Sequence, residues 1–540
     1  MKDISSTGSF INFYLNNYIY VDKTKYIRDL IKLERVFISR PRRFGKSLTL
    51  DTIATLFETG VEPYFKGTWI YDKWTEPTYP VLRLNFLDLD KYSLEHFKQK
   101  LNAIISSFAR DINVKNYEEK VEPEDTIYFL LDELRKEKRQ IVILIDEYDC
   151  QMTANINNET LYKQFQEKIT SFYATIKNKW PIKFLGISGV TRLKDVEIFS
   201  IGSDIRDITN ASAYSQMIGF TRDEIKKYYI DYLKLAASYE NNCTVDNVTE
   251  AQIESLLDRL AKNYDGYCFD EFYKKKVFST WSVNKFFQSV VSNKFVYFGE
   301  YWYDNGGLPS ILVNYLKTHE LNIFEYLDKD KFLKVSSDDF KNPTALTTIN
   351  QNVLMCQTGY LTLRSDLNKT STVALGIPNG EIYKALNRLL ANNIFKGNTD
   401  ITDDYGRSLL EVGTVDDIIN LFNSALNSVS YDNYPIVSES SVQNMLKLYL
   451  LGAHQKVLSE VHEAKGRADL VVNTDNRRIV FEFKYAKNET EAKSKLLDAV
   501  EQIKTRDYGN IVPNKTELLR IAAVFNADPK VRAFTEYQEV

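Results

Sequence analysis

The sequence contains few of the residues that build structural metal sites or disulfide frameworks. Only 4 cysteines and 4 histidines occur in 540 residues, and the cysteines stand far apart without C-x-x-C spacing. Structural zinc sites and small secreted disulfide domains both require cysteines at short, paired spacings. These two classes are therefore excluded, and we expect the cysteines to be small core residues of a protein from a reducing compartment.

Long apolar runs and a leader segment are absent as well. No uninterrupted apolar stretch approaches the roughly 20 residues that a membrane-spanning helix needs, and residues 1–17 lack a basic start followed by an apolar core. We therefore expect a cytoplasmic protein with no membrane partner. Because the net charge is only -4, nucleic acid would have to bind to a local basic patch.

The apolar material that is present suffices for several hydrophobic cores. Hydrophobic residues make up 44% and charged residues 26% of the chain, as in ordinary globular proteins. A single core seldom grows beyond about 250–300 residues, so this length predicts three or four domains. The 35 tyrosines are abundant; we interpret them as half-buried structural residues, with stacking on nucleic-acid bases as the alternative.

The most informative segment joins a strand-like run, 36–39, to the loop RPRRFGKS at residues 40–47, and helical spacing follows. Such a turn surrounds phosphate oxygens with backbone N–H groups. Gly45 permits the turn, Lys46 would contact the β- and γ-phosphates, and Ser47 would bind Mg²⁺. The loop therefore predicts a site for ATP and Mg²⁺.

This loop departs from the pattern G-x-x-x-x-G-K-[ST] at its first position. Arg40 replaces the first glycine, and Pro41 removes one backbone N–H from the phosphate cradle. We expect Arg42 or Arg43 to compensate by contacting phosphate directly. The alternative interpretation is a basic surface turn that precedes an amphipathic helix.

A second motif downstream complements the loop. The apolar run 141–145 is typical of a strand buried on both faces, and it ends in the adjacent carboxylates Asp146 and Glu147. At the carboxyl end of a parallel sheet, Asp146 would enter the Mg²⁺ shell and Glu147 would orient or deprotonate the attacking water. The order of the two motifs predicts a nucleoside triphosphatase.

The next strand-like run, 184–189, ends beside further polar residues. Ser188, Thr191 and Arg192 are candidates to contact the γ-phosphate, because in ATPases of this architecture such a position often senses that group. A buried strand that ends in a solvated arginine is the alternative interpretation. We include Arg192 among the nucleotide-binding residues.

Strand and helix patterns alternate up to about residue 215, which predicts a doubly wound α/β domain. Thr221-x-x-Glu224 is a capping box that opens a helical run through Leu233, and 253–260 shows helical spacing again. We expect four parts: an ATPase domain, 1–215; a helical lid, 216–295; a mixed, mostly helical linking domain, 296–432; and an α/β domain, 433–540.

The last part carries a second chemical centre. The strand-like runs 466–472 and 479–484 contain Asp469, Glu482 and Lys484 in the spacing D-x(12)-E-x-K. Period-two geometry places Glu482 and Lys484 on one face of a strand, within reach of Asp469 on the paired strand. Asp469 and Glu482 are hard oxygen ligands for Mg²⁺ or Mn²⁺, and Lys484 can hold a water or offset charge on a phosphate.

A helix-like segment over 441–458 would add Glu460 as a helix-borne metal ligand. A solvated hairpin with cross-strand ion pairs gives the same E-x-K spacing and is the alternative. A helix over 499–508 and a strand over 519–525 favour the metal site, because they complete most of an α-β-β-β-α-β order.

Basic residues also concentrate over 465–506, where Gln502 and Lys504 would face a groove for a nucleic-acid backbone.

With both centres in view, the chain resembles the predicted AAA-ATPase-like family whose members carry a C-terminal PD-(D/E)XK nuclease-superfamily domain. The resemblance covers nearly the whole chain. The blocks that carry it are VDKT (21–24), RPRRFGKS (40–47), IDEYD (145–149), GVTR (189–192), YDGY (264–267), QTGYL (357–361), IPN (377–379), GRAD (466–469) and EFK (482–484).

The resemblance implies ATP binding, ATP hydrolysis and a restriction-endonuclease-like core. The loop RPRRFGKS looks like the usual form in this family, so Arg40 would be a family trait. Ala468 stands where the superfamily has its name-giving proline, which is not a metal ligand, so this departure does not affect the predicted metal site. AAA-like ATPases often act as rings, so the resemblance also suggests a homo-oligomer.

These observations lead to one main hypothesis and two alternatives. We expect an ATPase coupled to a Mg²⁺-dependent nuclease that acts on nucleic acid, with ATP turnover gating or positioning the cutting domain. The first alternative is a nucleotide-switched module that binds nucleic acid or protein without cutting. The second is a scaffold with neither activity.

Overall fold

The computed structural model describes the chain except residues 178, 193–203, 305–309, 317–318, 320–322, 344, 396–404, 454, 464–465 and 509–516. It forms two compact units: unit 1 holds residues 1–319 and 332–382, and unit 2 holds residues 320–331 and 383–540. The predicted linking domain is thus divided between the units, and the other predicted boundaries stay predictions.

Among the helices that the structure describes, none combines the length and the apolarity that a membrane crossing needs.

Five parallel strands form the main sheet of unit 1 in the order β2-β3-β4-β1-β5. They are β1 (Arg35–Ser39), β2 (Val81–Asn85), β3 (Ile141–Asp146), β4 (Ile182–Gly189) and β5 (Arg206–Asp207). Every residue of β1 and β3 is buried, as expected where helices cover both faces of a parallel sheet. This confirms the predicted doubly wound α/β domain.

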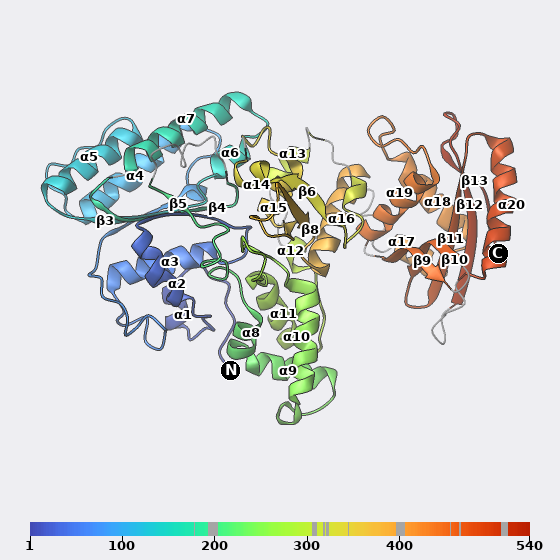
Figure 1. Ribbon diagram of the computed structural model, residues 1–540, viewed down its shortest axis with the longest axis horizontal. Helices are drawn as coiled ribbons and strands as arrows, with labels where there is room; N and C mark the ends of the chain where they lie inside the picture. The colour runs from blue at the N-terminus through green and yellow to red at the C-terminus, as the bar shows by residue number, and fades with distance from the viewer. Residues whose placement is uncertain are drawn as a thin grey trace. The chain divides into compact units, whose positions relative to one another are not determined.

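Helices lie on both sides of this sheet, with α4, α5 and α7 on one side and α3 on the other (Figure 1). Pro123 begins α5, whose first turn carries acidic residues and whose last turn carries basic ones, as the helix dipole favours. The helices are α1 (Phe10–Leu15), α2 (Thr24–Leu30), α3 (Lys46–Thr59), α4 (Leu94–Asp111), α5 (Pro123–Lys136), α6 (Cys150–Ala154) and α7 (Glu159–Ile176).

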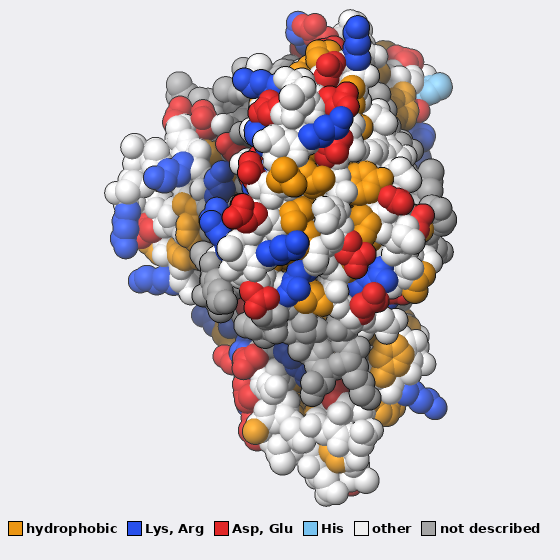
Figure 2. Space-filling model, turned by 90° about the vertical axis from the view of Figure 1, so that its right-hand side faces the viewer, with side chains coloured by type: hydrophobic (Ala, Val, Ile, Leu, Met, Phe, Trp, Pro, Cys, Tyr) orange, Lys and Arg blue, Asp and Glu red, His pale blue; other side chains and the backbone are white. Residues whose placement is uncertain are grey.

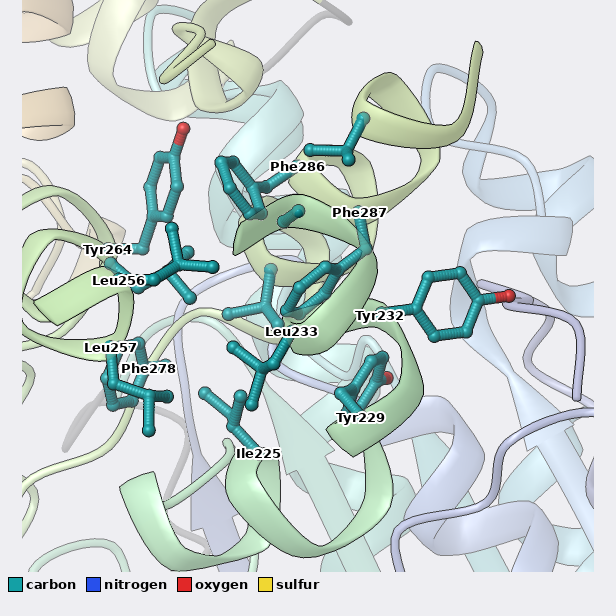
Figure 3. Close-up of a cluster of buried hydrophobic side chains, with 14 of the residues drawn as sticks. Ile225, Tyr229, Tyr232, Leu233, Leu256, Leu257, Tyr264, Phe278, Phe286 and Phe287 are labelled. Carbon is teal, nitrogen blue, oxygen red and sulfur yellow. The ribbon is translucent and has the colours of Figure 1, made fainter. Parts of the chain in front are cut away.

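Four helices in the range of the predicted lid share one hydrophobic core, to which Ile19 and Val21 also contribute: α8 (Arg222–Tyr228), α9 (Ile230–Glu240), α10 (Glu250–Tyr264) and α11 (Thr280–Asn293). We keep the name lid for these helices, and their role as a lid stays a prediction. The predicted capping box is present, because Thr221 and Glu224 exchange side-chain to backbone hydrogen bonds. The predicted single run through Leu233 is wrong in one respect, since it breaks between α8 and α9 at Tyr229. Tyr229 and Phe287 stack at 5.2 Å inside the core (Figure 3).

The rest of unit 1 contains an antiparallel sheet in the order β6-β8-β7. The mixed, mostly helical character expected of the linking domain stays a prediction, and β6 is a short strand in which buried and exposed residues alternate. The elements are α12 (Tyr301–Asp304), α13 (Ser310–Leu316), β6 (Leu333–Ser336), α14 (Ser337–Lys341), α15 (Gln351–Thr358), β7 (Thr362–Leu363), β8 (Thr372–Gly376) and the start of α16 (Gly380–Ile394).

Unit 2 is built on a mixed sheet in the order β13-β12-β11-β10-β9, in which β11 and β12 are parallel and the other pairs antiparallel. From α19 onward the predicted α-β-β-β-α-β order is confirmed, with β13 added at the end. The elements are α17 (Tyr405–Val412), α18 (Val415–Asn427), α19 (Glu439–Gly452), β9 (Lys456–Glu463), β10 (Gly466–Asn473), β11 (Arg477–Ala486), α20 (Glu489–Arg506), β12 (Glu517–Asn526) and β13 (Ala533–Glu539).

Figure 2 shows the side of the molecule on which α20 is drawn in Figure 1. Hydrophobic side chains gather near the centre of this face, and Leu497 of α20 is 70% exposed. Lysine and arginine side chains alternate there with aspartate and glutamate (Figure 2). Among the described side chains, this face therefore carries mixed charge rather than a continuous basic surface.

We predict that Gly189→Ala destabilises unit 1. A Cβ atom at Gly189 would lie 2.4 Å from Cδ1 of the buried Tyr148 ring and 2.8 Å from Oδ1 of Asp149. Neither neighbour has room to move, so the expected loss is about 1–3 kcal/mol, seen as a lower midpoint of thermal unfolding. Gly8→Ala is the matched control, because its Cβ would meet only Ser47 Cβ at 3.8 Å. Equal midpoints for the two variants would contradict the prediction.

Candidate functional site

The phosphate-loop sequence forms a tight turn between β1 and α3. Arg43 has φ 71° and Gly45 has φ 101°, both in the left-handed region, and α3 begins at Lys46. Glycine adopts this conformation without steric cost, which explains its place immediately before the helix. The turn delivers Lys46 and Ser47 to the carboxyl end of the sheet.

The two distant motifs meet at Asp146. Its Oδ2 accepts a hydrogen bond from Ser47 Oγ at 2.5 Å, and its Oδ1 accepts one from the backbone N–H of Glu147 at 3.0 Å. Ser188 Oγ also donates to Oδ1, so the ends of β3 and β4 and the start of α3 converge on one carboxylate. A hydroxyl and a carboxylate in contact are the oxygen donors that Mg²⁺ prefers.

Lys46 and Glu147 lie on the loop side of this carboxylate. The Lys46 ammonium donates to the carbonyl oxygens of Arg40 at 3.0 Å and Pro41 at 3.2 Å, and lies 3.8 Å from Oε1 of Glu147. Burial raises the pKa of Glu147, and the charge of Lys46 opposes that rise. Glu147 is therefore a carboxylate with increased basicity beside the predicted phosphate site, as a general base needs to be.

Asp149 is a residue of this site whose role the sequence did not reveal. It is 1% exposed, and its Oδ2 accepts hydrogen bonds from the backbone N–H and the hydroxyl of Thr191. Its Oδ1 accepts the backbone N–H of Val190 at 3.3 Å. Asp149 therefore fixes the chain where it leaves β4, next to Ser188.

The four arginines near the loop have different environments. Arg43 donates to the carbonyl oxygens of Tyr301 at 3.0 Å and Trp302 at 2.9 Å, and its guanidinium lies 4.8 Å from the Trp281 ring. Arg192 pairs with Asp207 and donates to the carbonyl oxygen of Lys341. Both guanidinium groups already bind carbonyl or carboxylate oxygens of the protein, so nucleotide binding by Arg43 and Arg192 stays a prediction.

Arg42 fits the predicted contact with phosphate best. Its side chain is partly exposed and makes no hydrogen bond or ion pair with the residues that the structure describes. It lies near enough to Glu147 for its charge to oppose the raised pKa of that carboxyl. An unpaired guanidinium beside the loop is available to an anionic ligand.

Arg40, in place of the first glycine, turns into the protein. It is 1% exposed, stacks on the Phe269 ring at 4.1 Å and donates to the carbonyl oxygens of Ser39 and Thr209. Burial lowers the pKa of Arg40 to about 9, so the group stays charged at neutral pH. Its Nε and Nη2 have no partner among the described residues, and Arg40 is one of the residues that line a cavity of about 40 Å³, room enough for a bound water.

Blocks that lie far apart in the sequence are joined around the loop. Phe44 meets the Tyr267 ring edge to face at 4.7 Å, and the Tyr267 hydroxyl donates to the carbonyl oxygen of Gly359 at 3.1 Å. Asn379 Nδ2 donates to the carbonyl oxygen of Asp265 at 2.8 Å. The blocks YDGY, QTGYL and IPN are therefore joined by hydrogen bonds, and YDGY contacts the phosphate loop through Tyr267.

A buried carboxyl group extends these contacts to the lid. Glu381 accepts hydrogen bonds from Ser282 Oγ at 2.7 Å and from the backbone N–H of Trp302 at 2.8 Å. Burial raises its pKa to about 8, so Glu381 is neutral at physiological pH. Since Arg43 binds the carbonyl oxygen of the same Trp302, the loop, α12 and α11 are tied together.

A cavity of about 140 Å³ lies beside the loop, between the N-terminal segment and the lid. Its walls are mostly apolar, and the polar residues that also line it are Ser5, Ser6, Thr7, Lys23, Arg43, Thr280 and Asn284. Lys23 belongs to the block VDKT and pairs with Glu224 of the lid at 2.6 Å. The lining includes Ile19, Tyr20, Val21, Phe44, Gly45, Leu48, Met217, Phe220, Tyr229 and Trp281.

The second centre lies in unit 2, where β10 and β11 run antiparallel. Asp469 and Glu482 adjoin the paired residues Leu470 and Phe481, and Asp469 Oδ2 accepts the backbone N–H of Phe483 at 2.8 Å. Lys484 Nζ lies 2.8 Å from Oε1 of Glu482, so these two side chains share a face as predicted. The structure therefore brings Asp469, Glu482 and Lys484 together.

Glu482 has the environment of a metal ligand. It is 1% exposed, and its Oε2 is buried without a hydrogen-bond partner among the described residues. Burial, assisted by the charge of Asp469, raises the pKa of Glu482 to about 7, although Lys484 opposes the rise. A buried carboxylate oxygen with no donor is a site that a divalent cation could satisfy.

Few side chains at the second centre could bind a metal ion. Among the described residues, no group of three or more His, Cys, Asp or Glu side chains is arranged to hold a metal ion. Asp469 and Glu482 supply two carboxylates, which suits Mg²⁺, because this ion usually keeps several waters and binds one or two carboxylates. The residues present therefore fit a Mg²⁺ or Mn²⁺ ion that is completed by water and substrate.

The prediction for Glu460 is corrected in one respect. Helix α19 ends at Gly452, and Glu460 lies in β9, because residues from Lys456 onward form a strand rather than a continued helix. The side chain of Glu460 lies outside the described part of the structure. The helix-borne carboxylate is Glu439 at the start of α19, whose Oε1 is 3.5 Å from Lys484 Nζ.

The predicted basic groove is only partly described. Lys465 lies outside the described residues, Lys504 is exposed on α20, and Gln502 Nε2 donates to the Tyr508 hydroxyl at 3.2 Å. Gln443 of α19 donates to the main-chain oxygen of Asp469, a contact that sequence spacing could not reveal. Binding of a nucleic-acid backbone here stays a prediction.

Comparison with known families bears on both units. Residues 5–199 match the family described as Predicted AAA-ATPase, and residues 437–535 match the PD-(D/E)XK nuclease superfamily. The two matches confirm the resemblance. Asp146 and Glu147 thus belong to an AAA-ATPase-like domain, and Asp469, Glu482 and Lys484 to a nuclease-like domain.

Two individual proteins were also found to be similar. An uncharacterized protein in the vnfD 5' region of Azotobacter chroococcum mcd 1 is 26% identical over 533 residues, which covers 95% of this chain and 94% of that protein. A crystal structure of Cdc6p from Pyrobaculum aerophilum is 10% identical, with a TM-score of 0.26, and covers 68% of this chain and 93% of that chain. This TM-score is too low to support an inference.

We predict that Glu482 makes the stability of the nuclease-like domain depend on pH. Because its folded pKa, about 7, lies above the ordinary value of 4.5, its stabilising contribution is full below about pH 4.5 and is lost as the pH rises to about 7. Glu482→Gln stays neutral and should gain up to about 3 kcal/mol relative to wild type between pH 5 and 8. Urea unfolding at both pH values measures this difference.

The exposed Glu489→Gln, at the start of α20, is the matched control and should show no such gain. Divalent cations should stabilise wild type at pH 8 but not Glu482→Gln, because only an ionised carboxylate binds them. A pH-independent difference between Glu482→Gln and wild type would contradict the assignment.

Proposed function

We propose that this protein is an ATP-hydrolysing, AAA-like ATPase coupled to a Mg²⁺-dependent nuclease that acts on nucleic acid. The observation that carries the proposal is the convergence of Ser47 on Asp146 at 2.5 Å, which joins two motifs remote in the sequence. A cytoplasmic location, nucleic acid as substrate and assembly into a homo-oligomer belong to the same proposal.

ATP would use the loop and the 140 Å³ cavity together. The mostly apolar cavity adjoins Gly45 and suits a planar base, since such sites combine apolar walls with a few polar groups. Lys46 would exchange the carbonyl oxygens of Arg40 and Pro41 for phosphate oxygens, and Arg42 would add a second positive charge. Tyr20 and Val21 would then flank the base.

Hydrolysis would depend on Glu147. Its raised pKa and its position near Lys46 support a role as the base that takes a proton from the attacking water. Ser47 and Asp146 would hold Mg²⁺, which would offset charge that develops on the phosphoryl oxygens. Ser188 would keep Asp146 in place through its hydrogen bond.

In the nuclease-like domain, Asp469 and Glu482 would hold a divalent cation that polarises the scissile phosphate. Lys484 would hold the attacking water or offset charge on the phosphate, because its ammonium group is fixed by Glu482 at 2.8 Å and faces Glu439 at 3.5 Å. Burial would lower the pKa of Lys484, but the hydrogen bond and charge of Glu482, with the charge of Glu439, raise it overall.

A second candidate function is a nucleotide-switched module that binds nucleic acid or protein without cutting. The two-carboxylate donor set favours it, because Glu482 already holds Lys484 and would bind a metal weakly while it is protonated. Cleavage and binding assays on the same substrates distinguish the two functions. A scaffold without either activity would show neither ATP turnover nor cleavage.

We predict that Glu147→Gln abolishes ATP hydrolysis but not ATP binding. Loss of a general base should lower the rate of phosphate release by about a hundredfold or more, while binding of a fluorescent ATP analogue persists. Lys46→Ala should lose both ATP binding and ATP hydrolysis, because it removes the contact between Lys46 and the phosphates. Glu159→Gln, an exposed glutamate on α7, is the matched control. Hydrolysis at the wild-type rate in Glu147→Gln would refute the assignment of the base.

We predict that the protein nicks plasmid DNA, RNA or single-stranded DNA in Mg²⁺ or Mn²⁺ and that a chelator stops it. Glu482→Ala and Lys484→Ala should each lower the rate by about a hundredfold or more. The exposed pair Glu489 and Lys493, 2.7 Å apart on α20, supplies matched Glu→Ala and Lys→Ala controls.

Binding without cleavage of any substrate would reject the nuclease and support the non-cutting module. If ATP turnover gates cleavage, Glu147→Gln should change the nicking rate while Glu159→Gln leaves it unchanged. Equal nicking rates in both variants would show that cleavage does not depend on ATP turnover.

A further inference from the structure

A hollow of about 410 Å³ opens in unit 1, and it shares the lining residues Ile19 and Tyr20 with the 140 Å³ cavity. Its walls come from α1, from the segment around Tyr64 to Thr68 and from the lid where α8 meets α9. We call it the tyrosine hollow, after the residues that dominate its lining: Tyr14, Tyr18, Tyr20, Tyr64, Tyr228 and Tyr232, with Lys2, Lys66 and Lys227.

The aromatic rings of the hollow are held in place by one another. Tyr14 and Tyr64 meet edge to face at 5.5 Å, and Tyr20 meets the buried Phe10 edge to face at 4.9 Å. Tyr20 is only partly exposed, and burial raises the pKa of its hydroxyl, which has Thr52 as a hydrogen-bond partner. Rings fixed in this way offer preformed surfaces for stacking.

One tyrosine joins the hollow to the lid core. Tyr232 extends from the hydrophobic cluster with its hydroxyl at the outer end (Figure 3), and that hydroxyl donates to the carbonyl oxygen of Lys2 at 2.8 Å. By contrast, the hydroxyls of Tyr14, Tyr18 and Tyr64 make no hydrogen bond to described residues. They are therefore available to a polar ligand.

Positive charge accompanies the rings. Lys2, Lys66 and Lys227 are exposed, and none forms an ion pair with a described residue, although Lys227 Nζ lies 4.9 Å from the centre of the Tyr228 ring. The carboxylate of Asp22 already accepts hydrogen bonds from Thr24 and from the backbone N–H of Trp69. Asp231 is the other carboxylate of the lining, so lysines outnumber acids in the hollow.

We propose that the tyrosine hollow binds one or two nucleotides of a single-stranded nucleic acid. Aromatic platforms interleaved with lysines are the combination by which proteins stack bases and hold the phosphate backbone without reading sequence. An uncharged ligand would leave Lys2, Lys66 and Lys227 without a role. This site does not depend on ATP hydrolysis or on cleavage by the nuclease-like domain.

The position of the hollow links strand binding to the lid. Tyr14 lies in α1 and Tyr64 in the segment that follows α3, whereas Tyr228 and Tyr232 belong to the lid. The hollow and the neighbouring cavity share the lining residues Phe13, Ile19 and Tyr20. A strand in the hollow therefore contacts the same segment that borders the proposed nucleotide.

Photocrosslinking of the full-length protein tests the proposal. The probe is a 5-bromouracil oligomer of about ten nucleotides, within the range of single-strand site sizes, with a chelator to prevent cleavage and a saturating ATP analogue. Mass spectrometry should place crosslinks on Tyr14, Tyr64 or Tyr228. Crosslinks confined to residues 437–535 would overturn the proposal.

Two double variants test the rings and the charges separately by fluorescence anisotropy with the same oligomer. Tyr14→Ala with Tyr64→Ala should weaken binding by about tenfold or more, because two stacking surfaces are removed. Lys66→Gln with Lys227→Gln should reduce the slope of log affinity against log salt concentration by about 0.7 for each phosphate that is no longer neutralised. Thermal unfolding midpoints verify that both variants remain folded.

The matched control is a tyrosine and lysine pair outside the hollow. Lys179 Nζ lies 5.1 Å from the ring of the exposed Tyr128 on α5, so Tyr128→Ala with Lys179→Gln removes the same groups. This control should bind and crosslink as wild type does. Equal binding by the control and by both hollow variants would overturn the proposal, as would binding of free GTP or a neutral oligosaccharide in the hollow without binding of the strand.

Discussion

The buried carboxylate of Asp146 is the group on which the arrangement of unit 1 depends. It receives hydrogen bonds from Ser47 on α3, from Ser188 on β4 and from the backbone of Glu147, which directly follows β3. A carboxylate that is largely withdrawn from water is strongly destabilising unless donors or cations surround it. The sheet order β3-β4-β1 supplies these donors, because it gathers the carboxyl ends of the three strands at one edge.

The arginine in place of glycine changes how the phosphate loop is supported. A glycine there would contribute only backbone, whereas Arg40 sends a guanidinium into the protein, against Phe269 and the carbonyl oxygen of Thr209. Phe44 and Arg43 add contacts to Tyr267 and Trp302. The loop is thereby held by side chains from the lid and the following region, so its conformation depends on elements more than two hundred residues away in the sequence.

Much of the fold and part of the site were predictable because their signals are local. The apolar run before Asp146 and the E-x-K spacing at Glu482 depend on strand periodicity, which a single segment reveals. The roles of Asp149, Glu439 and Glu381 were missed, because each acts through a partner from another element, such as Thr191, Lys484 or Trp302. Glu460 was predicted to lie on a helix, because the short apolar stretch before it fits the period of a helix as well as that of a strand. Only the pairing with β10 shows that this segment is a strand.

The register of β10 and β11 limits where the chain can change in length. Asp469 and Glu482 lie close together because they adjoin Leu470 and Phe481, the last pair of a ladder that is continuous from Asn473 opposite Arg478. Side chains alternate between the two faces of a strand, so one inserted or deleted residue inside this ladder would turn Glu482 away from Asp469. A change of chain length at the turn around Asp475 would leave this register intact, whereas one inside either strand would not.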